Sequence, residues 1–135
     1  MSSRGAVIEN GHVTTDEYQS KDGKKVCDAK VLIGTTSKQH GLPDYAHSPN
    51  SKYIKENSDG SFREMRVYDE NGFPILEIAY HPEQTLTGNR HEYVLHYHTF
   101  KNKDNLERVM GGILSETEHA DLYNDYKEYL EEYGL

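Results

Sequence analysis

The stretch from Lys52 to Tyr80, KYIKENSDGSFREMRVYDENGFPILEIAY, decides the fold. Two segments within it, Asn57–Gly60 and Asp69–Gly72, carry the Asn, Asp and Gly residues that favour hairpin turns. They separate three short runs of β-forming residues, at a spacing typical of a β-meander. The runs are Lys52–Lys55, Ser61–Tyr68 and Phe73–Tyr80. We therefore expect the middle of the chain to form an antiparallel sheet.

A further strand is predicted at Tyr93–Phe100. Successive side chains of a strand point to opposite faces, so His96 and His98 are expected on one face. On the earlier strands, Arg66 and Glu77 can form a cross-strand ion pair if the register places them opposite one another. Glu64 and Asp69 are the alternative partners for Arg66.

The C-terminal part, residues 103–135, is predicted to be helical. Ser115 and Glu118 fit a capping box, with Ser115 as the N-cap. A helical stripe then follows, formed by Leu122, Tyr126, Tyr129 and Tyr133 and widened by Tyr123 and Leu130. A shorter helix is expected over Lys103–Met110, ended by Gly111–Gly112.

The first 50 residues predict short strands and irregular structure. Val26–Ile33 is typical of a strand, and Ala6–Ile8 and Val13–Thr15 flank a hairpin turn. The segment Gly34–Asn50 is expected to be an irregular loop. Together the patterns predict one α+β domain over residues 1–135, an antiparallel meander of four or more strands packed against a C-terminal helix.

Composition narrows the class of protein. The chain has 135 residues and a net charge of −8. Residues 101–135 contribute 4 basic and 9 acidic side chains, a net of −5. This balance disfavours nonspecific binding to nucleic acid and favours a basic partner surface. No apolar run is long enough for a membrane span or a signal peptide, and the single Cys27 excludes a multi-cysteine zinc site. We expect a cytoplasmic protein.

Histidine is the unusual residue type, with eight in the chain and four of them between His81 and His98. Two imidazoles on one strand face suit two kinds of chemistry. They can bind a metal such as Zn²⁺, with a third ligand from His47, His81 or His91. They can also act as general acid and general base on a phosphate, without a cofactor.

The second chemistry has supporting residues nearby. In metal-independent RNA cleavage one histidine removes the 2′-hydroxyl proton and another protonates the leaving oxygen, while a cation stabilises the charged phosphorane. His96 and His98 with His81 are the candidate acid and base groups. Arg66 and Tyr68 are the candidates for support. No cofactor is expected in this case, and a zinc site on His96, His98 and His81 is the alternative.

The segment from Ser48 to Phe100 resembles a known family. Its core is Arg66-x-Tyr68-Asp69-x-x-Gly72, followed by Ile78-x-Tyr80-His81 and by His96-Tyr97-His98. The pattern is similar to the toxin-like C-terminal domains of phage and prophage minor head proteins. The resemblance implies a phage or prophage effector that acts on host machinery by nuclease activity, in the cytoplasm of the bacterial host. The resemblance implies that His81, His96 and His98 are site residues, with Arg66 and Tyr68 in support.

Size and negative charge are also similar to those of phage anti-CRISPR proteins. This similarity implies an acidic inhibitor that occupies the nucleic-acid groove of a host protein, such as an RNA-guided nuclease. Glu128, Glu131 and Glu132 are the candidate partner-binding residues in that case. RNA is the expected partner of the enzyme. A structural phage accessory protein without chemistry is the third function class.

Overall fold

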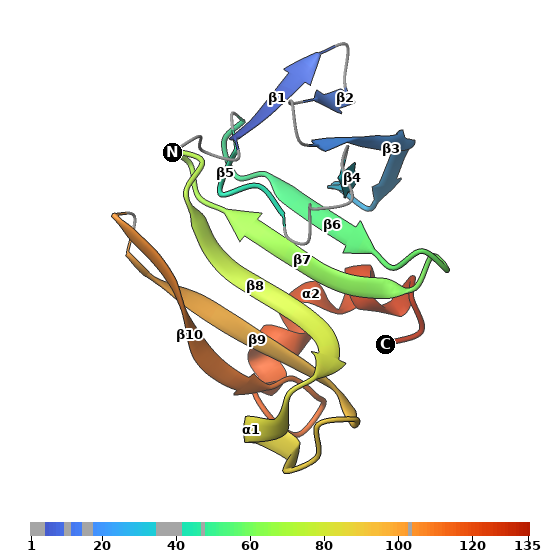
Figure 1. Ribbon diagram of the computed structural model, residues 1–135, viewed down its shortest axis with the longest axis vertical. Helices are drawn as coiled ribbons and strands as arrows, with labels where there is room; N and C mark the ends of the chain where they lie inside the picture. Colours follow the sequence, from blue (N-terminus) through green and yellow to red (C-terminus); the bar gives the residue numbers. More distant parts are fainter. Residues whose placement is uncertain (1–4, 10–11, 15–17, 35–41, 47, 103) are drawn as a thin grey trace.

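The computed structural model describes residues 5–9, 12–14, 18–34, 42–46, 48–102 and 104–135 (Figure 1). These ranges contain ten strands and two helices. The strands are β1 (Gly5–Glu9), β2 (His12–Thr14), β3 (Tyr18–Val26), β4 (Ala29–Gly34), β5 (Tyr45–Ala46), β6 (Lys52–Glu56), β7 (Phe62–Tyr68), β8 (Pro74–Pro82), β9 (Tyr93–Asn102) and β10 (Asn105–Ile113). The helices are α1 (Gln84–Thr87) and α2 (Ala120–Glu131). The predicted α+β class is confirmed.

The strands form one mixed, mostly antiparallel sheet in the order β10-β9-β8-β7-β6-β4-β3-β2-β1-β5. Strands β6 to β9 are the predicted meander, and β10 extends it, with neighbours in sequence also neighbours in the sheet. The pairs β4–β6 and β1–β5 are parallel. The predicted N-terminal hairpin is confirmed by the antiparallel pair β1–β2.

Helix α2 lies across one face of the sheet (Figure 1). Its Tyr123, Tyr129 and Leu130 are buried, and the other members of the predicted stripe pack against the same cluster. The sheet contributes alternate side chains to this contact, such as Met65 and Ile78. The helix therefore docks as its periodicity indicates, because an apolar stripe must be covered.

The predicted helix over Lys103–Met110 is wrong, because the residues from Asn105 onward belong to strand β10, which pairs with β9, and Lys103 lies outside the described residues. The glycines taken as a helix end instead sit at an irregularity in that pairing. A Cβ on Gly111 would lie 2.0 Å from the Tyr97 ring, and Gly112 has a φ of +148°. Glycine here permits close packing and an unusual backbone, which are general uses of the residue.

Helix α2 begins at Ala120, five positions after the predicted N-cap Ser115. The Ser115 hydroxyl does accept the backbone N–H of Glu118 at 2.9 Å, so the local hydrogen bond of a capping box is present. His119 lies in the left-handed region at φ +52°, and helical geometry starts only after it. The predicted strand Val26–Ile33 is likewise divided, by a turn at Cys27 and Asp28.

The face of the sheet opposite α2 carries a different set of side chains. Part of it is a small apolar cluster formed by Leu32, Leu42, Ala46, Tyr53 and Tyr68. Beyond that cluster, toward β8 and β9, ionisable side chains replace apolar ones.

Among the residues described, no helix is both long and apolar enough to cross a membrane.

Candidate metal centre

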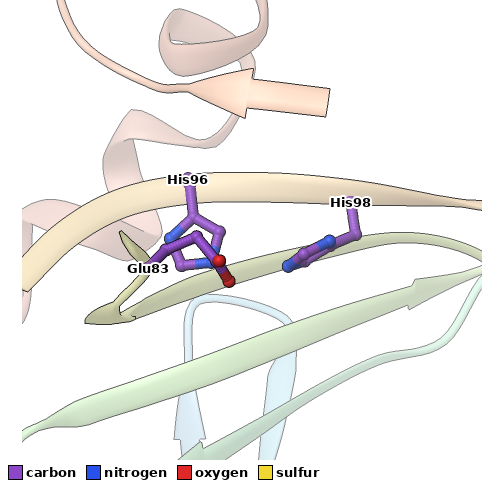
Figure 2. A group of neighbouring side chains, drawn as sticks. All are labelled: Glu83, His96 and His98. Atoms are coloured by element: carbon purple, nitrogen blue, oxygen red, sulfur yellow. The ribbon is translucent and has the colours of Figure 1, made fainter. Parts of the chain in front are cut away.

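Three potential metal ligands converge on the face opposite α2. His96 and His98 come from β9, and Glu83 comes from the junction between β8 and α1. Each offers one ligand atom, and these atoms all lie within 4.8 Å of one another. Figure 2 shows the Glu83 carboxylate and the two imidazole rings gathered on one side of β9. The strand alternation that places both histidines on one face is the predicted one.

The protonation state of His96 follows from its surroundings. Its Nδ1 lies 2.8 Å from the Val94 carbonyl oxygen, which can only accept a hydrogen bond. Nδ1 therefore donates its proton, and in the neutral ring Nε2 keeps a free lone pair. Nε2 is buried and has no hydrogen-bond partner among the described residues. A backbone carbonyl that fixes the tautomer in this way is the usual outer partner of a metal-bound histidine.

Burial keeps both histidines neutral. His96 is 0% exposed and His98 is 8% exposed. Burial is the main reason that the pKa of each imidazole is lowered from its ordinary value. The rings meet edge to face, with centroids 5.1 Å apart. Neutral imidazole is the form that binds a metal ion, so no proton must be removed first.

Glu83 supplies an oriented negative charge. The Thr85 hydroxyl donates a hydrogen bond of 2.8 Å to Glu83 Oε1. This bond is the main reason that the pKa of Glu83 is lowered, so the carboxylate is ionised at neutral pH. One carboxylate oxygen is held by Thr85, and the second remains to bind a metal ion.

A row of ionisable side chains, most of them buried, crosses the sheet beside this cluster. Arg66, Glu77 and His98 are register neighbours on β7, β8 and β9. Arg66 Nη2 lies 2.7 Å from Glu77 Oε2, which confirms the predicted cross-strand pair. Arg108 on β10 reaches the other oxygen, with Nη1 2.8 Å from Glu77 Oε1. Glu64, next to Arg66, is also buried.

The charges in this row act on one another. Burial alone would raise the pKa of Glu77. The positive charges of Arg66 and Arg108 and the hydrogen bonds with Arg66 and Glu64 together outweigh burial and lower the value to about 2. Burial and the neighbouring Glu77 charge raise the pKa of Glu64 to about 8. Glu64 is therefore protonated at neutral pH while Glu77 is ionised.

The other predicted site residues fall into two groups. His81 joins the cluster, with its ring 4.7 Å from that of His96, but its Nδ1 is 3.0 Å from the Pro82 carbonyl oxygen. Tyr68 lies apart: its hydroxyl donates to the Pro43 carbonyl and its ring packs on Tyr53. Tyr68 thus helps to hold the 42–46 segment over the sheet. Of the other proposed third ligands, His91 is exposed and His47 lies outside the described residues.

Glu83 and Arg108 are site residues that the sequence patterns did not single out, and Glu77 was predicted only as an ion-pair partner of Arg66. The sequence did contain a signal for Glu83. It follows His81-Pro82 directly, at the start of the segment that connects this strand to the strand carrying His96 and His98. The acidic residues proposed for partner binding, Glu128, Glu131 and Glu132, are exposed on or just after α2. They lie away from the histidine cluster, on the element that covers the other face.

Comparison of the chain with protein-family models, curated proteins and solved structures finds no significant match. The function is therefore argued from the geometry of the site.

Proposed function

We propose that the protein is a metal-dependent hydrolase whose metal ligands are Glu83, His96 and His98. The observation that carries this proposal is the convergence of the three ligand atoms around a buried, lone-pair-bearing His96 Nε2. Two histidines and one glutamate form a donor set that favours Zn²⁺. Three protein ligands leave a fourth position for water, which is the arrangement of catalytic rather than structural zinc sites.

The chemistry of such a site is hydrolysis. Zinc lowers the pKa of its bound water and so supplies a nucleophile at neutral pH. In ester hydrolysis the water oxygen forms a bond to the electrophilic atom, the bond to the leaving oxygen breaks, and the leaving oxygen takes up a proton. His81, beside His96, is the nearest further imidazole for that proton transfer.

The metal role is preferred to metal-independent acid–base catalysis because of burial. A general acid or base must come within hydrogen-bond reach of the substrate. The His96 ring is enclosed by the fold, and its Nε2 points toward the other ligands rather than toward solvent. An enclosed nitrogen suits a metal ligand, because a ligand acts through the metal ion and need not touch the substrate.

The biological setting is proposed from the resemblance of Ser48–Phe100 to phage toxin-like domains. We propose a phage- or prophage-encoded effector that acts on host machinery in the bacterial cytoplasm, with RNA as the first substrate to test. The net charge of −8 favours delivery of the RNA by a host protein partner over direct binding.

The test measures metal binding and cleavage on the same samples. Co²⁺ absorption and Zn²⁺ calorimetry would compare wild type with Glu83→Gln, His96→Ala and His98→Ala. The matched control is His91→Ala, an exposed histidine near the site in sequence. We expect each ligand variant to lose metal affinity by at least about tenfold, and the control to bind as wild type. Equal affinity in all variants would overturn the metal site.

Cleavage of structured RNA, single-stranded DNA and bis(p-nitrophenyl) phosphate would be followed with and without EDTA. We expect activity in the zinc-loaded protein that EDTA abolishes and zinc restores. RNA cleavage that persists in EDTA and is lost in His96→Ala would instead establish the metal-independent mechanism. Zinc binding without any cleavage would contradict the hydrolase and leave a metal-binding protein.

A further inference from the structure

Two arginines pair with Glu77, and they differ in what they leave free. Arg66 is buried and surrounded: Nη1 donates to the carbonyl oxygens of Leu42 and Pro43, at 3.1 and 3.2 Å, and Nη2 binds Glu77. Arg108 lies on the edge strand β10, and its side chain is 50% exposed. Among the described residues, Glu77 is the hydrogen-bond partner of Arg108 through Nη1, and half of the side chain remains exposed to solvent.

Arg108 is on the same face of the sheet as the metal ligands. It is the register partner of Phe100, and Phe100 lies two positions after His98 on β9. Residues two apart on a strand share a face. Both Arg108 and His98 lie beside Glu77: Arg108 Nη1 is 2.8 Å from Glu77 Oε1, and His98 is the register partner of Glu77.

A bound metal ion would make the local charge opposite in sign to that of the whole chain. The buried and half-buried charged groups at the site are Arg66, Arg108, Asp44, Glu77 and Glu83. Two positive and three negative charges give −1, and a bound Zn²⁺ changes this to +1. A positive site attracts an anion. The rest of this protein, with a net charge of −8, repels the anion, so binding would be confined to the site.

We propose that Arg108 binds the anionic group of the substrate, and that the substrate class is a phosphate ester. This inference rests on the proposed metal site, since the metal ion and the guanidinium would form two adjacent binding points. A guanidinium offers several N–H donors in a planar fork that matches phosphate oxygens. Glu77 positions that fork by holding one of its arms.

The test uses phenylphosphonate, a phosphate monoester mimic that cannot be hydrolysed at its P–C bond. Calorimetric titrations would compare zinc-loaded wild type with Arg108→Gln and Arg108→Lys. Lys101→Gln is the matched control, because it removes one exposed positive charge from the neighbouring strand β9. The neutral dimethyl ester of phenylphosphonate is the matched ligand control.

We expect wild type and Lys101→Gln to bind phenylphosphonate equally well and Arg108→Gln to bind it roughly tenfold to a hundredfold more weakly. Arg108→Lys should be intermediate, because it restores the charge but not the fork. The neutral ester should not bind. Equal binding by Arg108→Gln and wild type, or no binding by zinc-loaded wild type, would overturn the inference.

Zinc affinity and hydrolysis, measured on the same samples, separate this inference from the proposed function. Arg108→Gln should keep wild-type zinc affinity, because Arg108 is not a ligand. Arg108-dependent binding of phenylphosphonate without hydrolysis of any substrate would contradict only the hydrolase. Hydrolysis of bis(p-nitrophenyl) phosphate with an unchanged KM in Arg108→Gln would contradict only the role of Arg108.

Discussion

The two faces of strands β7, β8 and β9 bury opposite kinds of side chain. On the face covered by α2, β7 and β8 place apolar side chains such as Met65 and Ile78 against the helix. On the other face, β7, β8 and β9 bury five ionisable side chains: Glu64, Arg66, Glu77, His96 and His98. The apolar face stabilises the fold in proportion to the area it removes from water. The ionisable face must overcome the loss of hydration of each group.

The difference indicates where the molecule keeps its chemistry. A buried ion pair contributes little more to stability than apolar side chains of the same size, and often less. The Arg66–Glu77 pair is therefore a costly way to fill the space between β7 and β8. What it does provide is a fixed charge beside His98 and an anchor for Arg108. We infer that the apolar face holds the fold together and that the ionisable face holds the site.

The largest expected effect comes from Glu77→Ala. This change leaves Arg66 buried without its main carboxylate partner, which typically costs about 3–5 kcal/mol of stability. Glu70→Ala is the control, because Glu70 is exposed in the turn before β8. Urea unfolding of both variants measures the free energy of unfolding. A Glu77→Ala protein as stable as Glu70→Ala would contradict the view that this pair is tightly coupled.

The neighbouring residue tests the other face. Ile78→Ala removes a side chain that is fully buried under α2 and should cost about 2–5 kcal/mol, as large-to-small core changes do. Ile75→Ala, on the same strand but 49% exposed, is the control and should cost far less. Zinc affinity of the folded Ile78→Ala protein should equal that of wild type. A loss of zinc binding there would show that the two faces are not independent.

A pH series on wild type and Glu64→Gln tests the protonation of Glu64 on the ionisable face. The rise of its pKa from 4.5 to about 8 corresponds to roughly 4 kcal/mol of pH-dependent stability. The pKa of Glu64 is raised to about 8, so the folded protein binds its proton more tightly than the unfolded chain does. Its contribution is complete below the ordinary glutamate pKa and is lost as the pH rises through about 8. We expect wild type to lose stability relative to Glu64→Gln between pH 5 and pH 9, roughly the window that this shift defines. Parallel unfolding curves for the two proteins across that range would show that Glu64 is not held protonated.

The sequence was sufficient for what depends on local alternation. The turns at Asn57–Gly60 and Asp69–Gly72 fix the meander, and their spacing also brings Arg66 opposite Glu77. The shared face of His96 and His98 follows from strand geometry alone. These features need no knowledge of how distant segments meet.

The rest depends on long-range geometry. Glu83 becomes a ligand candidate only because β8 and β9 pair antiparallel. This pairing places the end of β8, where Glu83 follows, beside the strand that carries His96 and His98. Arg108 is not among the predicted site residues, because the sequence predicts a helix where the structure has strand β10. A glycine pair after a polar segment fits a helix end and a strand irregularity equally well. The position of α2 after His119, rather than after Ser115, depends on a left-handed residue that no pattern indicated.

The smallest effect on stability is expected from charge reversal on the helix side. The changes Glu128→Lys, Glu131→Lys and Glu132→Lys affect exposed residues. Among the described residues, the ion pair in this group is a weak one between Glu131 and Lys127, at 3.7 Å. Each change should alter the free energy of unfolding by no more than about 0.5 kcal/mol and leave zinc affinity unchanged.

The same variants test the alternative function of an acidic inhibitor, because that function would use this surface and not the histidine face. Binding to a host RNA-guided nuclease–guide complex would be measured at low and high salt, since exposed charges act more strongly at low salt. If the acidic surface binds a basic groove, the protein carrying all three Glu→Lys changes should not bind at low salt, whereas His96→Ala should bind as wild type. The opposite pattern, with binding lost only in His96→Ala, would place the partner on the ionisable face and unite the partner with the metal site.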